Sequence, residues 1–141
     1  MVRSNLLQPP RCLAATLSIT ASLAGAIAPA LPSAAQIIPD RSLGGDRSRV
    51  TPGVTIRGDR ADRIDGGALR GSSLFHSFEQ FNVNNHQRVY FSNPAGVATI
   101  FSRVTGTDVS DILGTLGVDG RADLFFLNPN GIVFGPNAQL D

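Results

Sequence analysis

The side chains most able to bind a metal ion or ligand in this 141-residue sequence lie close together in one charged segment. Regularly spaced carboxylates could bind Ca²⁺, which prefers several oxygen ligands. Neither the EF-hand spacing nor the glycine-rich nonapeptide of calcium-binding repeats is present. Arginines equal the carboxylates in number, so the favoured interpretation is a solvated loop whose charges pair with one another. The alternating residues are Asp59, Asp62 and Asp65 with Arg57, Arg60 and Arg63.

The same segment contains the tripeptide Arg57-Gly58-Asp59, which can bind integrins when a loop displays it. Its polar surroundings, between Gly53 and Gly67, are typical of an exposed loop. Because Arg, Gly and Asp are frequent in this region, the tripeptide arises easily by chance. Chance occurrence of the tripeptide is therefore favoured over a role in adhesion.

Residues for catalysis are scarce, and no catalytic, cofactor-binding or metal-binding residue is predicted. The only histidines, His76 and His86, have no Cys or Glu at ligand spacing, and Glu79 is the single glutamate. His76 fits a hydrogen-bonded packing residue on a strand better than a ligand. No serine stands in a nucleophile elbow. Carbohydrate-cleaving β-helices use charged clusters on successive coils, so a carbohydrate-active or carbohydrate-binding module stays as an alternative.

Residues 128–131 have the composition of a tight turn. The sequence Asn128-Pro129-Asn130-Gly131 separates two apolar runs, residues 124–127 and 132–134. Proline fixes φ near −65°, and Asn or Gly adopts positive φ at low cost. The two runs could form a β-hairpin, or they could be two faces of one coil in a parallel β-helix. Periodicity alone does not distinguish these arrangements.

Residues 1–35 differ in composition from the rest of the chain. Arg3 and Arg11 precede an uncharged stretch whose residues 12–28 are mostly small and apolar. Pro29 and Pro32 then break any helix, and Ser33, Ala34 and Ala35 are small residues as at a signal-peptidase site. This pattern predicts a secretory signal peptide cleaved between Ala35 and Gln36, with an uncleaved membrane anchor as the less favoured reading.

Removal of such a peptide changes the charge and the thiol content of the chain. The formal net charge falls from +1 to −1 because two arginines are lost, and the only cysteine, Cys12, is lost too. A near-neutral chain lacks the clustered positive charge that nucleic-acid binding requires. A cysteine-free chain suits an oxidising compartment outside the cytoplasm.

The remaining chain, residues 36–141, is expected to be all-β. Glycines and prolines interrupt short apolar pieces, and no helix-length periodicity appears. Continuous apolar runs such as 124–127 indicate strands buried on both faces, as in a parallel sheet or a solenoid. Residues 97–104 are expected to form a further strand. The chain stops in a polar stretch after residue 134, which is typical of the leading part of a longer solenoid.

The phenylalanines of residues 74–83 predict a local distortion. Phe75, Phe81 and Val83 share one strand parity, whereas Phe78 has the other. A bend near residues 79–80 would turn all of these side chains toward one core.

Four ordered blocks together resemble the N-terminal secretion domain of filamentous haemagglutinin-type exoproteins, the transported partners of two-partner secretion. The resemblance covers residues 37–141 and is similar to cyanobacterial versions of the domain. The blocks are residues 74–78 with 81–83, residues 91–95, residues 102–106 and residues 127–132.

The resemblance implies a right-handed parallel β-helix with an N-terminal cap, incomplete at its C-terminus. It also implies that two motifs mark the secretion domain. The second motif is intact, while the first departs from the expected Asn-Ala-Asn-Leu because Asp replaces its second Asn and Arg its first. Asp keeps the acceptor oxygens and loses the amide donor. The implied motif residues are Asp123, Leu124, Asn128, Pro129, Asn130, Gly131 and Ile132.

The implied function is that of a non-enzymatic secretion domain that delivers an adhesin or other exoprotein to the cell surface or the medium through the periplasm. The implied partner is an outer-membrane Omp85-type, TpsB-like transporter, with folding of the β-helix nucleated outside the cell and no cofactor required. A monomer is expected. A truncated gene fragment without cargo is a further alternative.

Overall fold

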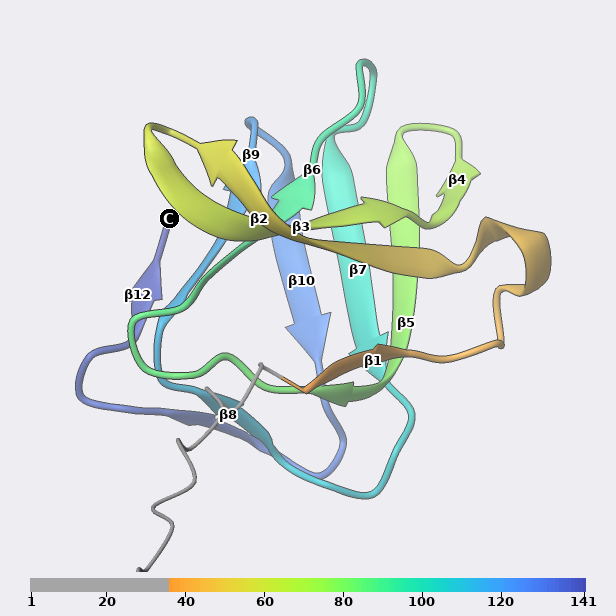
Figure 1. The fold of residues 1–141 in the computed structure, drawn as a ribbon. Helices are drawn as coiled ribbons and strands as arrows, with labels where there is room; N and C mark the ends of the chain where they lie inside the picture. The colour runs from red at the N-terminus through yellow and green to blue at the C-terminus, as the bar shows by residue number, and fades with distance from the viewer. Residues whose placement is uncertain (1–35) are drawn as a thin grey trace, which may run out of the picture.

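The computed structural model describes residues 36–141, and the expected signal peptide with Ala35 lies outside the described residues. These residues form twelve strands and one short 3₁₀ turn, η1 (Gly44–Asp46), without an α-helix (Figure 1). Among them no helix has the length and apolar character to span a membrane. The strands are β1 (Ile37–Pro39), β2 (Ser48–Ile56), β3 (Asp59–Gly66), β4 (Ala68–Arg70), β5 (Ser73–Phe81), β6 (Arg88–Ser92), β7 (Thr99–Val104), β8 (Ser110–Ile112), β9 (Thr115–Asp119), β10 (Asp123–Leu127), β11 (Ile132–Phe134) and β12 (Gln139–Leu140).

Successive strands wind into a parallel β-solenoid of about three turns, so the expected fold class is confirmed. The first coil contains β5, the bridge residue Val83 and β6; the second contains β7, β8 and β9; the third contains β10, β11 and β12. Each strand pairs in parallel with its counterpart in the next coil. Residues 22 to 29 positions apart in the sequence therefore lie one above another.

An N-terminal cap covers one end of the solenoid. Strands β1 and β4 pair antiparallel with β5, while β2 and β3 form a hairpin whose second strand pairs in parallel with β6. Figure 1 shows the hairpin crossing in front of the coils. The third coil has no such cover among the described residues, because β10, β11 and β12 are each the last strand of their sheet.

The interior is built from rows of stacked apolar side chains. Leu74, Ile100 and Leu124 stand in register across β5, β7 and β10. The first two are 3% and 0% exposed, whereas Leu124 at the open end is half-buried. The expectation that the run 124–127 is buried on both faces is wrong, because Phe125 and Leu127 are 51% and 53% exposed while Leu124 and Phe126 face the core.

The alternative of a hairpin around residues 128–131 is wrong. β10 pairs with β7 and β11 pairs with β8, both in parallel, so the two apolar runs are two faces of one coil. The turn between them is a corner of the solenoid. Residues 97–104 do form a strand, β7, which begins at Thr99.

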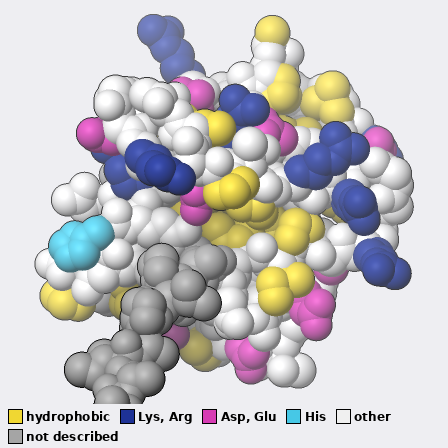
Figure 2. All heavy atoms as spheres, in the orientation of Figure 1, with side chains coloured by type: hydrophobic (Ala, Val, Ile, Leu, Met, Phe, Trp, Pro, Cys, Tyr) yellow, Lys and Arg dark blue, Asp and Glu magenta, His cyan; other side chains and the backbone are white. Residues whose placement is uncertain are grey.

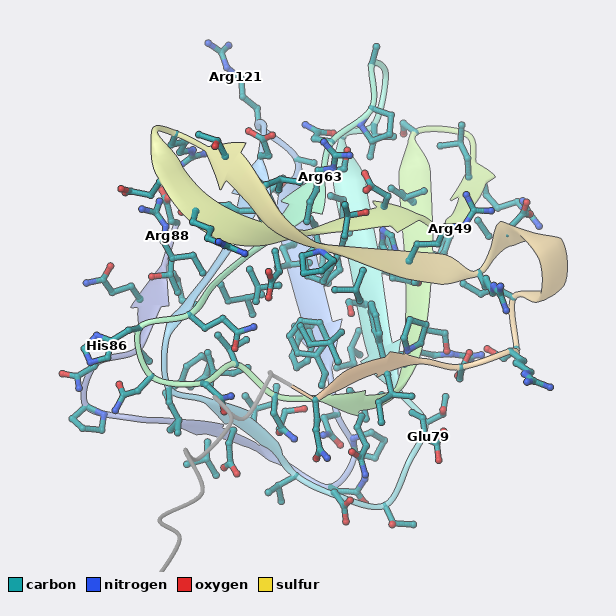
Figure 3. All side chains as sticks on the ribbon, viewed as in Figure 1. Arg49, Arg63, Glu79, His86, Arg88 and Arg121 are labelled. Atoms are coloured by element: carbon teal, nitrogen blue, oxygen red, sulfur yellow. The ribbon has the colours of Figure 1, made fainter. Side chains whose placement is uncertain are left out.

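The predicted bend near residues 79–80 is present, but its expected effect is only partly right. The register between β1 and β5 passes from Gln80 to Phe78 and skips Glu79, whose side chain points outward (Figure 3). Phe78 and Phe81 are consequently both buried. Phe75 is not in the core. It lies on the outer face, 36% exposed, because the bend comes after it and cannot change its parity.

Candidate functional site

The intact half of the predicted secretion motif forms the corner between β10 and β11. The Gly131 amide donates to the Asn128 carbonyl oxygen at 3.1 Å, which closes the turn. The Asn128 Oδ1 atom accepts from the Asn130 amide at 2.9 Å. Gly131 has a φ of 114°, a value that side-chain-bearing residues rarely adopt. The residue types thus match the geometry of the turn.

The two asparagines of this corner also bind the corner of the preceding coil. Asn128 Nδ2 donates to the Asp108 carbonyl oxygen at 3.0 Å and to Ser110 Oγ at 2.9 Å. Asn130 Nδ2 donates to the Gly106 carbonyl oxygen at 2.7 Å. These bonds join residues 18 to 24 positions apart. The corner therefore fixes the third coil onto the second by side-chain hydrogen bonds as well as by the strand ladder.

The altered half of the motif lies at the opposite end of β10. The Asp123 amide donates to the Ala98 carbonyl oxygen at 3.0 Å, while its exposed carboxylate accepts no hydrogen bond from the described part of the chain. Leu124 and Ile132 are half-buried and pack against the core. The motif residues thus form two groups, one at the start of β10 and one after its end.

The interior of the solenoid is accessible at the third coil. A cavity of about 500 Å³ opens there, and inward-facing side chains of β10, β11 and β12 contribute to its wall. Phe134 and Leu140 are 53% and 71% exposed, although their in-register neighbours Ile112 and Leu116 are buried. Within the part of the chain that the structure describes, this end presents apolar side chains together with the outer edges of three strands that pair on one side only. The inward-facing residues are Leu124, Phe126, Ile132, Phe134 and Leu140.

His76 is a buried packing residue. Its Nδ1 atom shares a 2.9 Å hydrogen bond with Ser48 Oγ of the cap, and its ring contacts Phe91 with centroids 5.1 Å apart. The Nε2 atom has no partner among the described residues. Burial lowers the pKa of His76 from 6.5 to about 4, against a weaker opposing effect of Asp65. The ring therefore stays neutral at physiological pH.

The buried histidine predicts a loss of stability in mild acid. The folded chain disfavours the protonated ring, so its stability is complete above pH 6.5 and declines as the pH falls toward 4. We expect a loss of about 2 kcal/mol between pH 7 and pH 5. Urea unfolding across this range measures it. His76→Gln should make the free energy of unfolding less dependent on pH. His86→Gln, which changes a histidine on an exposed turn, is the control and should leave that dependence unchanged. An equal pH slope for His76→Gln and the unsubstituted chain would contradict the assignment.

Asp40 does not interfere in that pH window. Partial burial raises its pKa, but hydrogen bonds from Ser77, Ser42 and Thr105 outweigh this and bring the pKa to about 2. Its contribution to stability is present above pH 4 and is lost only as the pH falls toward 2. These bonds connect the chain after β1 to the first two coils, with Ser77 Oγ 2.6 Å and Thr105 Oγ1 2.8 Å from the carboxylate.

The aspartates of the charged segment lie on strand β3 and not in the loop expected from the sequence. Asp62 accepts from Gln87 Nε2 at 2.7 Å and from the Gly53 amide at 3.0 Å. Asp65 accepts from Arg63 Nε at 2.9 Å. Among the described residues, no three His, Cys, Asp or Glu side chains gather as a metal site would require. The expected pairing of charges within the segment is seen only between Arg63 and Asp65, whereas Arg57 pairs with Asp141 and Asp59 pairs with Arg88.

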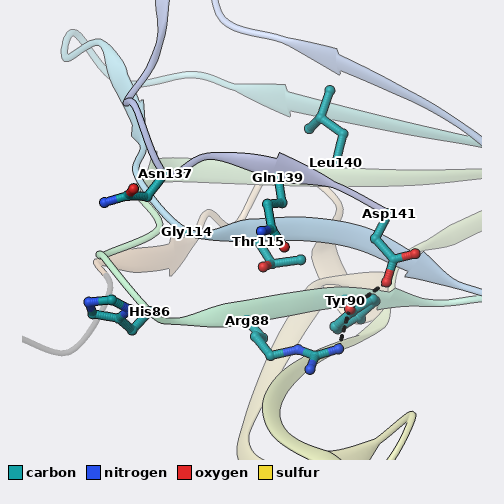
Figure 4. A pocket seen from close by; sticks show the side chains of 9 residues that line it. All are labelled: His86, Arg88, Tyr90, Gly114, Thr115, Asn137, Gln139, Leu140 and Asp141. Atoms are coloured by element: carbon teal, nitrogen blue, oxygen red, sulfur yellow. Dashed lines mark hydrogen bonds between the residues drawn. The ribbon is translucent and has the colours of Figure 1, made fainter.

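A polar groove on the outer face of β6, β9 and β12 was not predicted from the sequence. It has a volume of about 790 Å³ and contains Arg88, Thr115 and Gln139, which stand in register on the three strands (Figure 4). At its base the buried Tyr90 hydroxyl donates to Asp141 Oδ2 at 2.7 Å and accepts from Arg88 Nη2 at 2.7 Å. Burial raises the pKa of Tyr90, and its hydrogen bond to the carboxylate adds to this.

Charges of both signs are mixed over the molecular surface. Figure 2 shows basic and acidic side chains on the same face, with apolar side chains between them. On the outer face of β5, β7 and β10, three phenylalanines form a stacked row with successive ring centroids 5.2 Å apart. These rings are Phe75, Phe101 and Phe125.

Comparisons with known proteins agree with the fold. The family model described as TPS secretion domain matches residues 35–141. Among curated relatives, a heme/hemopexin-binding protein of Haemophilus influenzae (strain ATCC 51907 / DSM 11121 / KW20 / Rd) is 28% identical over 64 residues, 45% of this chain and 7% of that protein. A second heme/hemopexin-binding protein of Haemophilus influenzae is 28% identical over 89 residues, 62% of this chain and 9% of that protein. No solved structure matches.

Proposed function

The chain belongs to the TPS secretion domain family, and we propose that an outer-membrane Omp85-type transporter recognises it and that its β-helix forms outside the cell. Domains of this family are exported parts of two-partner secretion exoproteins and act with a TpsB-type transporter. In the proposed route, residues 1–35 direct the chain into the periplasm and are removed between Ala35 and Gln36. Residues 36–141 then cross the outer membrane as a monomer.

The open third coil is the observation that carries the proposal. Within residues 36–141 its apolar side chains are half-exposed, and each of its three strands pairs on one edge only. Such an end can add further strands in parallel, which buries side chains such as Phe134 and Leu140. Each square ångström of apolar surface buried contributes about 25 cal/mol. Addition of coils outside the cell would therefore favour outward movement of the chain without nucleotide hydrolysis.

The corner asparagines support recognition of the chain before it folds. In the folded domain both side-chain amides are occupied by hydrogen bonds to the turn and to the preceding coil. A transporter could contact these groups freely only while the chain is extended. We therefore place recognition by the periplasmic part of the transporter before formation of the third coil.

The names of the relatives do not define the activity of this chain. Its matched part spans less than a tenth of each heme/hemopexin-binding protein. The ring of His76 is buried and bonded to Ser48, a poor arrangement for ligation of a heme iron. The proposed role is delivery of a cargo, and no enzymatic step is included.

Carbohydrate binding is a second candidate, favoured by the polar groove of Figure 4. The side chains of Thr115 and Gln139 make no hydrogen bond within the described part and face the same groove. Groups of this kind could bind sugar hydroxyls. A pull-down on immobilised polysaccharides tests this candidate. Absence of binding would remove its support and leave the secretion role unaffected.

Export in the presence and absence of the transporter tests the main proposal. Cells that produce the chain together with its TpsB-type partner should release it or show it on the surface. Cells without the partner should hold at least about ten times more of it in the periplasm, because without a barrel the polar backbone of the chain has no path through the lipid. The decisive measurement is the extracellular fraction. Equal release from both strains would contradict transporter-dependent export.

A further inference from the structure

The tip of the β2–β3 hairpin lies against the outside of the solenoid. Its turn consists of Arg57 and Gly58, both with positive φ, 52° and 88°. Successive residues with positive φ are typical of the tight turns that match the twist of a two-stranded ribbon. Ile56 and Ala61, on either side of the turn, pack on the buried ring of Tyr90 in a cluster separate from the main core. The hairpin tip is thus anchored on the first coil.

Both charged residues of the Arg57-Gly58-Asp59 tripeptide bind other coils. Arg57 forms an ion pair with Asp141 and donates from Nη2 to the Val118 carbonyl oxygen at 3.0 Å. Asp59 forms an ion pair with Arg88. The tripeptide therefore contacts the first coil through Arg88, the second through Val118, and the residue that follows β12 of the third.

Tyr90 holds this arrangement together. The guanidinium carbons of Arg57 and Arg88 each lie 5.4 Å from the centroid of its ring, a distance at which cations are attracted to an aromatic face. Its hydroxyl reaches Asp141, two coils away from β6. The neighbouring strand carries Gly117, where an added Cβ would lie 2.8 Å from the Tyr90 ring and collide with the Asp141 carbonyl oxygen. Because residue 117 has no side chain, the Tyr90 ring can lie against the backbone of this strand.

We propose that the Arg57-Gly58-Asp59 turn is an intramolecular clasp that locks the N-terminal cap onto the second and third coils. Arg57 is 61 residues from Val118 and 84 residues from Asp141 in the sequence. These contacts cannot form before both coils are in place, so the clasp closes late in folding. Contacts that form after the transition state slow unfolding and leave the folding rate unchanged. The clasp does not depend on the proposed function, because it rests only on contacts within the folded chain.

Unfolding and refolding rates of the purified chain test the clasp. Arg57→Gln removes the ion pair and should raise the unfolding rate about fivefold, with the refolding rate changed less than about twofold. Arg60→Gln is the matched control, because Arg60 lies on the same hairpin, is exposed and makes no hydrogen bond or ion pair within the described residues. It should change neither rate by more than about twofold.

Two further measurements separate a clasp from a general effect of the hairpin. Tyr90→Phe keeps the ring and removes the hydroxyl, so it should also accelerate unfolding, and the Arg57→Gln and Tyr90→Phe effects should be non-additive. An unchanged unfolding rate for Arg57→Gln, or a refolding rate slowed by the same factor, would overturn the proposal. So would tight binding of the folded chain to an Arg-Gly-Asp-binding integrin, because that requires Arg57 and Asp59 to be free.

Discussion

Asn128→Val and Gly131→Val are each expected to leave the chain in the periplasm, with the extracellular fraction reduced about tenfold or more. Valine at 128 removes both side-chain bonds to the preceding coil and the acceptor for the Asn130 amide. Valine at 131 would have to adopt a φ of 114°, which costs a β-branched residue of order 1–3 kcal/mol. Under the proposed function, the first change also alters a group that the transporter reads.

Asn137→Val is the matched control for this prediction. Asn137 is also an asparagine in a turn of the third coil, but it is exposed and its side chain makes only one hydrogen bond, to Asn85 at 3.2 Å. Its export should stay within about twofold of the unsubstituted chain. Pulse-labelling followed by fractionation of cells that contain the transporter gives the required ratio. Normal release of both corner variants would show that this turn has no part in export.

The corner could be predicted from the sequence because its requirements are local. Proline and glycine fix the backbone within four residues, and the Asn128 side chain caps the turn that contains it. Whether the flanking strands formed a hairpin or a coil depended on partners about 25 residues earlier, β7 and β8. Periodicity within a single run carries no information about such partners. The family resemblance supplied that part of the prediction.

The clasp and the polar groove could not be predicted in the same way. Tyr90 and Asp141 are 51 residues apart, and only the winding of the coils brings them to one face. Arg57 and Asp59 were visible in the sequence, but their polar surroundings predicted an exposed loop in which both charges are free to bind a partner. In the fold they are used by neighbouring coils. Phe75 was misplaced for a related reason, since a bend moves only the residues that follow it.

Phe91→Ala is expected to destabilise the folded chain by about 3–5 kcal/mol. Phe91 is fully buried and contacts three other rings, with centroid distances of 5.1 Å to His76, 5.9 Å to Phe81 and 6.3 Å to Phe78. Its replacement would leave a cavity at the centre of the first coil. A domain of about 100 residues has a total stability of about 5–15 kcal/mol, so this single change removes a large share of it.

The same variant separates folding from recognition. Phe91 lies outside the secretion motif, so Phe91→Ala should still engage the transporter but emerge as a chain that extracellular protease degrades. Phe125→Ala is the control, because Phe125 is 51% exposed on the outer aromatic row, and it should cost about 1 kcal/mol or less. Urea unfolding and protease resistance of released material measure both effects. If Phe91→Ala were as protease-resistant as Phe125→Ala, stacking in the first coil would not limit the stability of the β-helix.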